Sequence, residues 1–196
     1  QELKNYFHII SFDLPGHGLS SSENKPLKSA SEWMEYFINR FKQFLKKLNL
    51  DKFHVMGHSM GGFLMTHFAD RYPEMVNKII LLSPAGVNKL NLKYQQRLKN
   101  HYKKLSWINR NLLLFVRNRI FKSKFSPFDL LGFRLFKDLL VKKYFSDRIK
   151  IPENEQNLFV PIYKEIVRTK MSSMECVGYF FNNGPTSDLP IMPILK

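Results

Sequence analysis

Hydrophobic residues in the first part of the chain gather in three short runs that predict β-strands. Each run is rich in β-branched or aromatic residues and lies next to turn-forming or charged residues. The runs are YFHIISF (6–12), KFHVMG (52–57) and VNKIILLS (76–83). The first leads into the turn residues of DLPGHGLSS (13–21), and Pro84 closes the third.

Two segments between these runs have the periodicity of amphipathic helices. Residues 29–48 place apolar side chains at steps of three and four residues, and Ser29 or Ser31 offers an N-cap. Residues 59–73 form a second helical pattern, which Pro73 ends. The order of strand, helix, strand, helix and strand is typical of parallel strands joined by crossover helices, so we expect an α/β fold.

The second half of the chain predicts a helical insertion. Residues 88–150 read as mostly helical, 158–181 contain a further helical pattern, and LPIMPILK (189–196) has the character of an opening strand. We therefore predict a core over 1–87, a basic helical cap over 88–185 and the truncated start of the next core strand over 186–196.

Composition places the chain among globular proteins with a substantial core. It has 196 residues, 44% of them hydrophobic. It contains no apolar run of about 18 residues, the length that would predict a membrane span. A single cysteine, Cys176, excludes an internal disulfide framework and favours a reducing compartment. The chain starts at Gln1 without a signal pattern, which says little about the native start.

The net charge of +15 is concentrated in one block. Residues 89–150 hold 17 Lys and Arg against three Asp, a net charge of +14, whereas the rest of the chain holds 14 basic and 13 acidic residues. The block is also apolar, a pattern typical of a surface attracted to anionic lipid headgroups, and a solvated helix face is the open alternative. No zinc-finger or RNA-recognition signature accompanies it, so nucleic acid is not an expected partner.

The stretch Gly57-His58-Ser59-Met60-Gly61 matches the G-x-S-x-G nucleophile elbow, between a predicted strand and a predicted helix as that motif requires. Such a turn strains the nucleophile's backbone, and side chains at Gly57 and Gly61 would collide with the neighbouring strand and helix. We therefore predict Ser59 as the nucleophile and the Met60 backbone amide as an oxyanion donor near the positive end of the helix dipole. His58 and Gly62 complete the elbow and its pocket.

Three motifs of this chain resemble the α/β-hydrolase family. FDLPGHGLS looks like that fold's fourth-strand exit, VMGHSMGG like its fifth strand and elbow, and ADRYPEMVNKIILLSPAGV like its third helix and sixth strand. The stretch from Ser59 to Gly86 further resembles a lipid-acting branch, the α/β-hydrolase-domain proteins 4 and 5. That branch includes N-acyl-phosphatidylethanolamine lipases, a lipid-droplet co-activator of triglyceride lipase and fungal cardiolipin deacylases. Specific likeness covers residues 6–90, and weaker likeness continues to 196.

Two positions bear on that resemblance. The branch usually has an acidic residue, Pro, Trp and Gly after the sixth strand, whereas Ser83, Pro84, Ala85 and Gly86 stand here, without the tryptophan. Its non-hydrolytic co-activators carry asparagine where a lipase has serine. Ser59 therefore favours hydrolysis over a scaffold role.

The residues that would activate Ser59 are not found in this chain. The family's triad runs in the order Ser, acid, His, and only His67 and His101 follow Ser59 among the six histidines. His67 lies about 12 Å from Ser59 along one helix, and His101 belongs to the basic block. Asp188 precedes the last predicted strand, whereas the family's acid follows it. The family's third strand, which would separate 6–12 from 52–57, is also missing. We therefore expect an internal fragment of a hydrolase, which begins just before the fourth strand and stops inside the seventh.

Other reactive side chains have structural explanations. We expect Asp13, His17 and Ser20 to tie their own loop, and Cys176 to be a lone buried or half-buried thiol. No spacing of His, Cys, Asp or Glu indicates a metal, and no glycine-rich phosphate loop is present. We expect neither a metal nor a cofactor.

The function that we expect is hydrolysis of acyl ester or amide bonds in lipids or phospholipids through an acyl-enzyme on Ser59. Residues 89–150 would contact an anionic membrane or a lipid droplet. Two alternatives stay open: a non-catalytic adaptor that activates a partner lipase, and a lysophospholipid acyltransferase. The expected location is intracellular, in the cytoplasm at the periphery of a membrane or lipid droplet, with a mitochondrial location also open.

Overall fold

The computed structural model describes residues 2–21, 27–89, 92–107, 110–111, 114, 161–162, 176–181 and 186–195. The elements in chain order are η1 (Glu2–Asn5), α1 (Ala30–Lys47), β1 (Phe53–His58), α2 (Met60–Arg71), η2 (Pro73–Met75), β2 (Val76–Leu82), α3 (Leu92–Lys104) and α7 (Cys176–Phe180). The helices expected at 29–48 and 59–73 and the strands expected at 52–57 and 76–83 are confirmed, with bounds that differ by two residues at most.

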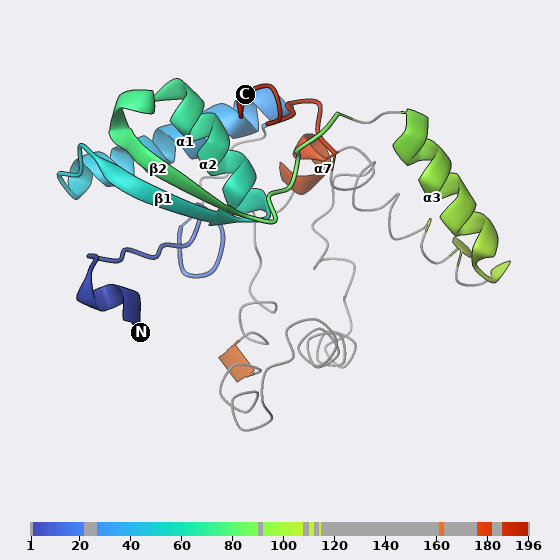
Figure 1. Ribbon diagram of the computed structural model, residues 1–196, viewed down its shortest axis with the longest axis horizontal. Coiled ribbons are helices and arrows are strands. Elements are labelled where there is room, and N and C mark those ends of the chain that lie inside the picture. Colours follow the sequence, from blue (N-terminus) through green and yellow to red (C-terminus); the bar gives the residue numbers. More distant parts are fainter. Residues whose placement is uncertain are drawn as a thin grey trace.

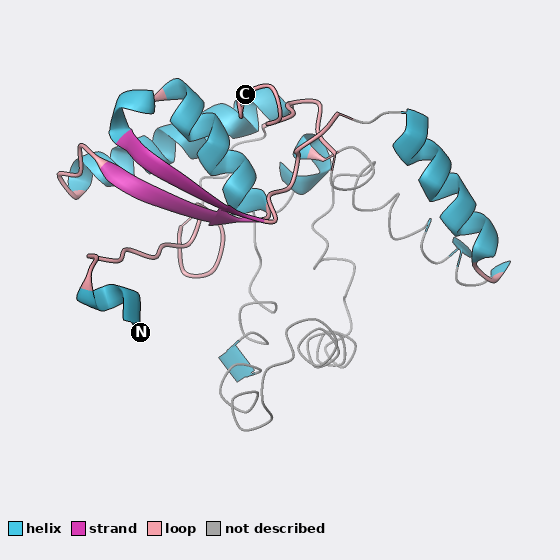
Figure 2. Cartoon of the chain, viewed as in Figure 1, coloured by secondary structure: helices cyan, strands magenta, loops and turns pink. Residues whose placement is uncertain are grey.

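The centre of the described fold is a parallel pair of strands covered by two helices. β1 and β2 pair in a register that sets Val55 beside Ile79, and α2 is the crossover between them. Figures 1 and 2 show α1 and α2 on the same face of this sheet. The opposite face carries Met56, Ile80 and Leu82, which are all exposed. The predicted parallel α/β arrangement is therefore present, with one sheet face covered among the described residues.

Helix α1 begins at the Ser-x-x-Glu pattern of a capping box, in which the glutamate here binds the amide one residue before the N-cap. The Ser29 hydroxyl accepts a hydrogen bond from the Glu32 amide at 3.2 Å, and the Glu32 carboxylate accepts one from the Lys28 amide at 2.7 Å. Of the two predicted N-caps, Ser29 is thus the one used. Apolar residues then recur along one face, and this face is buried as the periodicity predicts: Trp33, Met34, Phe37, Ile38, Phe41 and Leu45.

Aromatic side chains hold α1, α2 and the sheet together. Phe41 of α1 packs edge-on against Phe68 of α2, with ring centroids 4.7 Å apart, and against Phe53 of β1 at 6.0 Å. An ion pair of 2.6 Å between Arg71 and Glu35 joins the same two helices at the surface. The core that supports Ser59 is therefore built from the two helices that the sequence pattern predicts.

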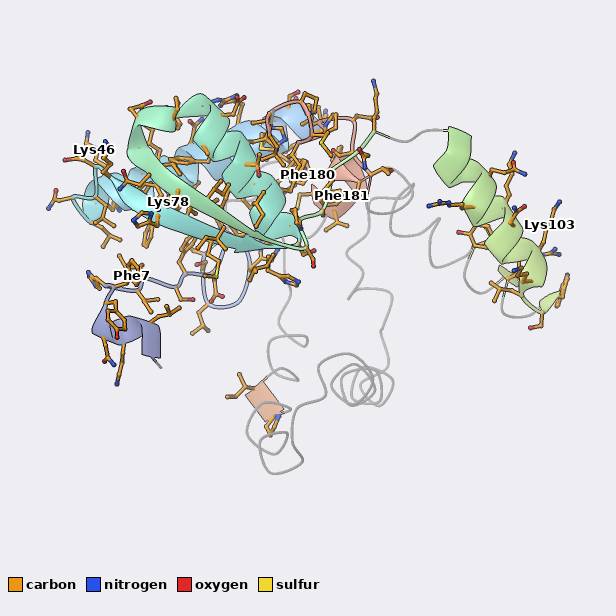
Figure 3. The ribbon with its side chains drawn as sticks, in the orientation of Figure 1. Phe7, Lys46, Lys78, Lys103, Phe180 and Phe181 are labelled. Atoms are coloured by element: carbon orange, nitrogen blue, oxygen red, sulfur yellow. The ribbon has the colours of Figure 1, made fainter. Side chains whose placement is uncertain are left out.

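Helix α7 packs against both of these helices. Its Phe180 is fully buried, with ring centroids 5.2 Å from Phe63 of α2 and 6.2 Å from Phe37 of α1. Phe181, directly after the helix, lies 5.1 Å from Phe63 (Figure 3). The end of the predicted cap therefore packs into the core. The rest of the helical pattern predicted at 158–181 lies outside the described residues, apart from 161–162.

The strand predicted at 6–12 is wrong for the described structure. This segment is extended but pairs with no described strand, and Tyr6, Phe7 and Ile9 are exposed. Phe12 instead stacks on Phe41 of α1 at 5.1 Å. A β-rich run becomes a strand only when a neighbouring strand accepts its hydrogen bonds, and no described strand pairs with this one, although the Phe7 ring lies 6.1 Å from the His54 ring of β1.

The strand predicted at 189–196 is also wrong within the described residues, which end at 195. Residues 191–195 form a turn, in which the Ile194 and Leu195 amides both donate to the Ile191 carbonyl. Pro190 precedes this turn and Pro193 lies within it, and neither can donate a ladder hydrogen bond. Ile191 is nevertheless fully buried, so this segment is part of the core.

Helix α3 is the described part of the predicted basic cap. It extends away from the sheet and its helices in Figure 1. The helical pattern predicted for the remainder of 88–150 lies outside the described residues, apart from a few positions after α3. None of the helices that the structure describes combines the length and hydropathy needed to cross a membrane.

Candidate active site at the strand–helix turn

Ser59 occupies the turn between β1 and α2 in a conformation that non-glycine residues rarely adopt. Its φ is 52° and its ψ is −118°. The Ser59 amide donates to the Leu82 carbonyl at 3.1 Å, and its carbonyl accepts from the Phe63 amide at 3.2 Å and the Ala85 amide at 3.0 Å. Strain of this kind persists where surrounding bonds over-determine it, and such residues cluster at functional sites.

The Ser59 side chain is exposed and takes no part in capping α2. Serine at an N-cap position ordinarily accepts a hydrogen bond from the first turn of its helix. Here the backbone conformation turns the residue away from that role. The hydroxyl of this exposed residue at the start of α2 is therefore not used in a capping bond.

Two glycines allow the strand and the helix to approach each other at this turn. A Cβ at Gly57 would lie 2.6 Å from the Gly62 nitrogen and 2.7 Å from the Gly61 carbonyl carbon. A Cβ at Gly62 would lie 3.0 Å from both the Gly57 oxygen and the Pro84 Cβ. The steric need predicted for Gly57 is thus confirmed.

The collision predicted for Gly61 is wrong. A Cβ built there meets no atom within 4 Å among the described residues. Gly61 is the second residue of α2, and its side-chain direction leads away from β1, whereas Gly62 faces the strand and the loop after β2. Gly62 therefore has the second close approach that the motif pattern assigned to Gly61.

Met60, the predicted oxyanion donor, is the first residue of α2. The first amides of an α-helix have no acceptor inside the helix, and they lie at its positive end. The Met60 side chain is half-buried and contacts α7, where the Cys176 Sγ lies 3.9 Å from the Met60 Sδ. Cys176 itself is fully buried, as expected for a structural thiol. The contact joins residues 116 positions apart, so no local sequence signal could have found it.

The histidines near the elbow have different surroundings. His58, at the end of β1, is exposed. His67 is partly buried, and its Nε2 lies 3.1 Å from the Leu189 carbonyl oxygen, so Nε2 carries a proton and donates. Burial lowers the pKa of His67 and outweighs the hydrogen bond to Leu189, which acts in the opposite direction. His101 belongs to α3. His67 thus holds the segment that contains Leu189, and it lies eight residues along the chain from Ser59.

The loop that follows residue 12 is held by its own side chains. The Asp13 carboxylate accepts from the Leu19 amide at 3.2 Å, and the Ser20 hydroxyl donates to the Asp13 carbonyl at 2.8 Å. Gly18 has a φ of 52°, and a Cβ there would collide with the Asp13 carboxylate. The His17 Nδ1 lies 3.2 Å from the Pro15 carbonyl, and burial lowers the pKa of His17. These contacts agree with the structural roles expected for Asp13, His17 and Ser20.

An open cavity of about 400 Å³ lies between this loop and α1. Phe12, Tyr36 and Phe41 are among its lining residues, and Ser59 is not. Within the described ranges, no three side chains of His, Cys, Asp or Glu come together as a metal site would require. The chemistry that the described residues bring together is thus a strained, exposed serine at a helix N-terminus.

Comparisons with known proteins identify the fold family. The α/β-hydrolase fold family matches residues 2–156. The abhydrolase domain-containing protein abhd-5.2 of Caenorhabditis elegans is 33% identical over 111 residues, which are 55% of this chain and 24% of that protein. A probable 1-acylglycerol-3-phosphate O-acyltransferase of Oryza sativa is 27% identical over 198 residues, which are 97% of this chain and 46% of that protein.

A solved structure shares the fold at low sequence identity. The meta-cleavage product hydrolase CumD of Pseudomonas fluorescens superposes with a TM-score of 0.53 at 15% identity, over 91% of this chain and 52% of that one. The chain spans about half the length of that structure and less than half the length of the relatives above. Since the family match covers well over half of its residues, the chain belongs to the α/β-hydrolase fold family.

Proposed function

We propose that the protein containing this chain is a serine hydrolase that cleaves acyl ester or amide bonds of lipids or phospholipids. The observation that carries the proposal is Ser59, an exposed residue with a strained backbone at a strand–helix turn and a side chain that does not cap the helix. Exposure of the nucleophile on a strained turn is the mechanical requirement of the G-x-S-x-G elbow. A serine used merely as a helix cap would need neither.

The proposed reaction forms an acyl-enzyme on Ser59. The Ser59 hydroxyl loses its proton to a base, and its oxygen bonds to the acyl carbonyl carbon. The Met60 amide stabilises the resulting oxyanion from the positive end of α2. The leaving group takes up the proton as its bond to the carbonyl breaks, and water then releases the acid and restores Ser59. The proposal places the activating acid and histidine outside residues 1–196.

The lipid class of the substrate is supported by the relatives. The relative from Caenorhabditis elegans is named abhydrolase domain-containing protein abhd-5.2, and the α/β-hydrolase-domain proteins 4 and 5 are the lipid-acting branch that this sequence resembles. Two others, from Oryza sativa and Arabidopsis thaliana, are named for acyl transfer to 1-acylglycerol-3-phosphate, and each match spans 97% of this chain. An acyl group on a glycerophospholipid is therefore the substrate element that we propose for Ser59.

The described part of the basic cap supports docking on an anionic lipid surface. Arg97, Lys99, Lys103 and Lys104 of α3 are exposed, and Lys103 points away from the body of the protein in Figure 3. Trp107 follows the helix with 70% of its surface exposed. Cationic side chains beside an exposed tryptophan suit the interface of a negatively charged membrane or droplet. We propose a peripheral, intracellular location on this basis.

Acyl transfer to a lysophospholipid is the second candidate, favoured by the names of the two plant relatives. It uses the same acyl-enzyme on Ser59 but replaces water by an alcohol as the acceptor. A non-catalytic adaptor that activates a partner lipase is the remaining alternative. The serine at position 59 argues against it, because a non-catalytic adaptor does not require a nucleophile on a strained turn.

The experiment that tests the proposal is labelling of the full-length protein with a fluorophosphonate, which reacts with activated serines. We expect labelling of the wild type and none of Ser59→Ala. Ser31→Ala, at an exposed position on α1, is the matched control and should label as the wild type does. A folded wild type that does not label would refute the hydrolase and support the adaptor. Where labelling succeeds, release of fatty acid with and without added lysophospholipid distinguishes hydrolysis from acyl transfer.

A further inference from the structure

We propose that His67 is a positioning residue for Ser59, which acts through the segment 186–195 and the loop after β2. This inference rests on the proposed function, since it concerns the reactivity of Ser59. Ser59 is the N-cap of α2 and His67 lies eight residues further along, about 12 Å in helical rise, so His67 does not touch the reacting atoms. Its influence follows a chain of hydrogen bonds that starts and ends on the same helix.

The first link joins α2 to the segment 186–195. The His67 Nε2–H donates to the Leu189 carbonyl at 3.1 Å, across 122 residues of sequence. The imidazole ring also packs edge-on against Phe63, with centroids 4.8 Å apart. Ring packing and hydrogen bond together fix the direction of the donor. Loss of this donor would remove the His67 bond to the Leu189 carbonyl. The free-energy cost is larger at a partly buried site than in water.

The second link joins that segment to the loop after β2. The Ile191 amide donates to the Gly86 carbonyl and the Met192 amide to the Val87 carbonyl, both at 3.0 Å. The Ser187 amide donates to the Asn88 carbonyl at 3.1 Å. Three backbone bonds thus hold residues 86–88 against the segment that His67 anchors.

The third link joins the same loop to the elbow. The Ala85 amide donates to the Ser59 carbonyl at 3.0 Å, and Pro84 lies against Gly62 at the start of α2. Gly86 has a φ of 67° and no room for a Cβ, because Phe63 and Ser187 occupy that space. The loop is therefore confined between the elbow, Phe63 and the segment 186–195.

These links explain how a distant histidine can affect the nucleophile. The strained Ser59 conformation is held by few bonds, and the one from Ala85 comes from this loop. If 186–195 moves away from α2, the loop loses its outer support, and the Ala85 bond to Ser59 weakens. His67 therefore helps to fix the conformation in which Ser59 reacts.

The test compares two substitutions that separate the two contacts of His67. His67→Phe keeps an aromatic ring against Phe63 but has no donor, whereas His67→Gln keeps an N–H donor near the position of Nε2. In the full-length protein we expect the rate constant of fluorophosphonate labelling at Ser59 to fall about two- to tenfold in His67→Phe, as expected for one lost hydrogen bond. His67→Gln should recover most of that rate.

A matched control separates positioning from general loss of stability. Ile38→Val removes one methylene from the buried face of α1, away from this chain of bonds, and costs about as much stability as one hydrogen bond. All variants are labelled at a temperature where circular dichroism shows them folded. Labelling at the wild-type rate in His67→Phe, or equal slowing in Ile38→Val, would overturn the inference.

Hydrogen exchange gives a second readout that does not depend on reactivity. The amides of Ala85, Ile191 and Met192 should exchange faster in His67→Phe than in the wild type, and near the wild-type rate in His67→Gln. Unchanged exchange at these three amides would overturn the inference even if labelling slowed. A wild type that is not labelled at all would refute the proposed function and this role together, whereas a labelled wild type with an unaffected His67→Phe refutes this role alone.

Discussion

Alanine at Gly57 and alanine at Gly61 are expected to have opposite effects on stability, although both glycines belong to the same five-residue motif. A methyl group at position 57 would lie 2.6 Å from the Gly62 nitrogen, and ordinary contact begins at 3.4 Å. The strand and the helix would have to separate by about 0.8 Å, since the atoms it meets are backbone. A methyl group at position 61 meets nothing within 4 Å among the described residues.

These distances fix the sign and the approximate size of each effect. Overpacking of a well-packed site costs about 1–3 kcal/mol, and backbone atoms place Gly57→Ala toward the upper end of that range. Gly61 lies inside α2 without a positive φ, so alanine there gains about 0.5–1 kcal/mol from reduced chain entropy in the unfolded state. The two variants should therefore differ by about 2–4 kcal/mol in free energy of unfolding.

Equilibrium urea unfolding of the full-length protein, followed by circular dichroism, measures this difference. Both variants change one glycine to alanine, so each is the control for the other. Gly62→Ala should also be destabilising, because its Cβ would lie 3.0 Å from Pro84 and the Gly57 oxygen. Equal destabilisation by Gly57→Ala and Gly61→Ala would refute the assignment of the close approach to Gly62 in place of Gly61.

Two further predictions concern pH and lipid binding. Burial lowers the pKa of both His17 and His67 from the ordinary value of 6.5, so the unfolded chain binds more protons as pH falls through this value. The free energy of unfolding should decrease from pH 7.5 to pH 5.5, and the decrease should be smaller in His67→Gln; a urea midpoint that is constant or rises on acidification would contradict this. Lys99, Lys103 and Lys104 are exposed on α3, so replacing all three by Glu should weaken sedimentation with anionic phosphatidylserine vesicles and leave binding to neutral phosphatidylcholine vesicles unchanged. Equal sedimentation of the wild type and the triple variant with anionic vesicles would argue against docking through α3.

The elements that could be predicted from sequence are those whose signal is local. The buried face of α1 follows from its own periodicity, and its start follows from Ser29 and Glu32. Residues 6–12 show the limit of this reasoning. Their composition favours a β-strand, but a strand also needs a partner strand, and the local sequence does not specify one. The strand prediction for 189–196 was wrong for a related reason. The Ile191 and Met192 amides donate to the loop at 86–88 rather than to a strand.

The candidate site also has features that the sequence predicts and features that it does not. The position of Ser59 and the crowding at Gly57 could be predicted because the motif lies between a strand and a helix. The exchange of roles between Gly61 and Gly62 could not, since it depends on where Pro84 lies after β2. Neither the Cys176 contact with Met60 nor the His67 bond to Leu189 has a sequence signal, because each joins positions more than a hundred residues apart.

The bonds that hold Ser59 also have a consequence for the order of folding. Its amide is bound to Leu82, the last residue of β2, and its carbonyl to Ala85 beyond that strand. The elbow therefore cannot be complete until the crossover has closed and the parallel pair has formed, and non-local pairings of this kind form slowly. We expect partly folded forms of the protein to contain α1 and α2 before they contain a reactive serine. Such intermediates would lack the Ser59 conformation on which the proposed acyl-enzyme depends.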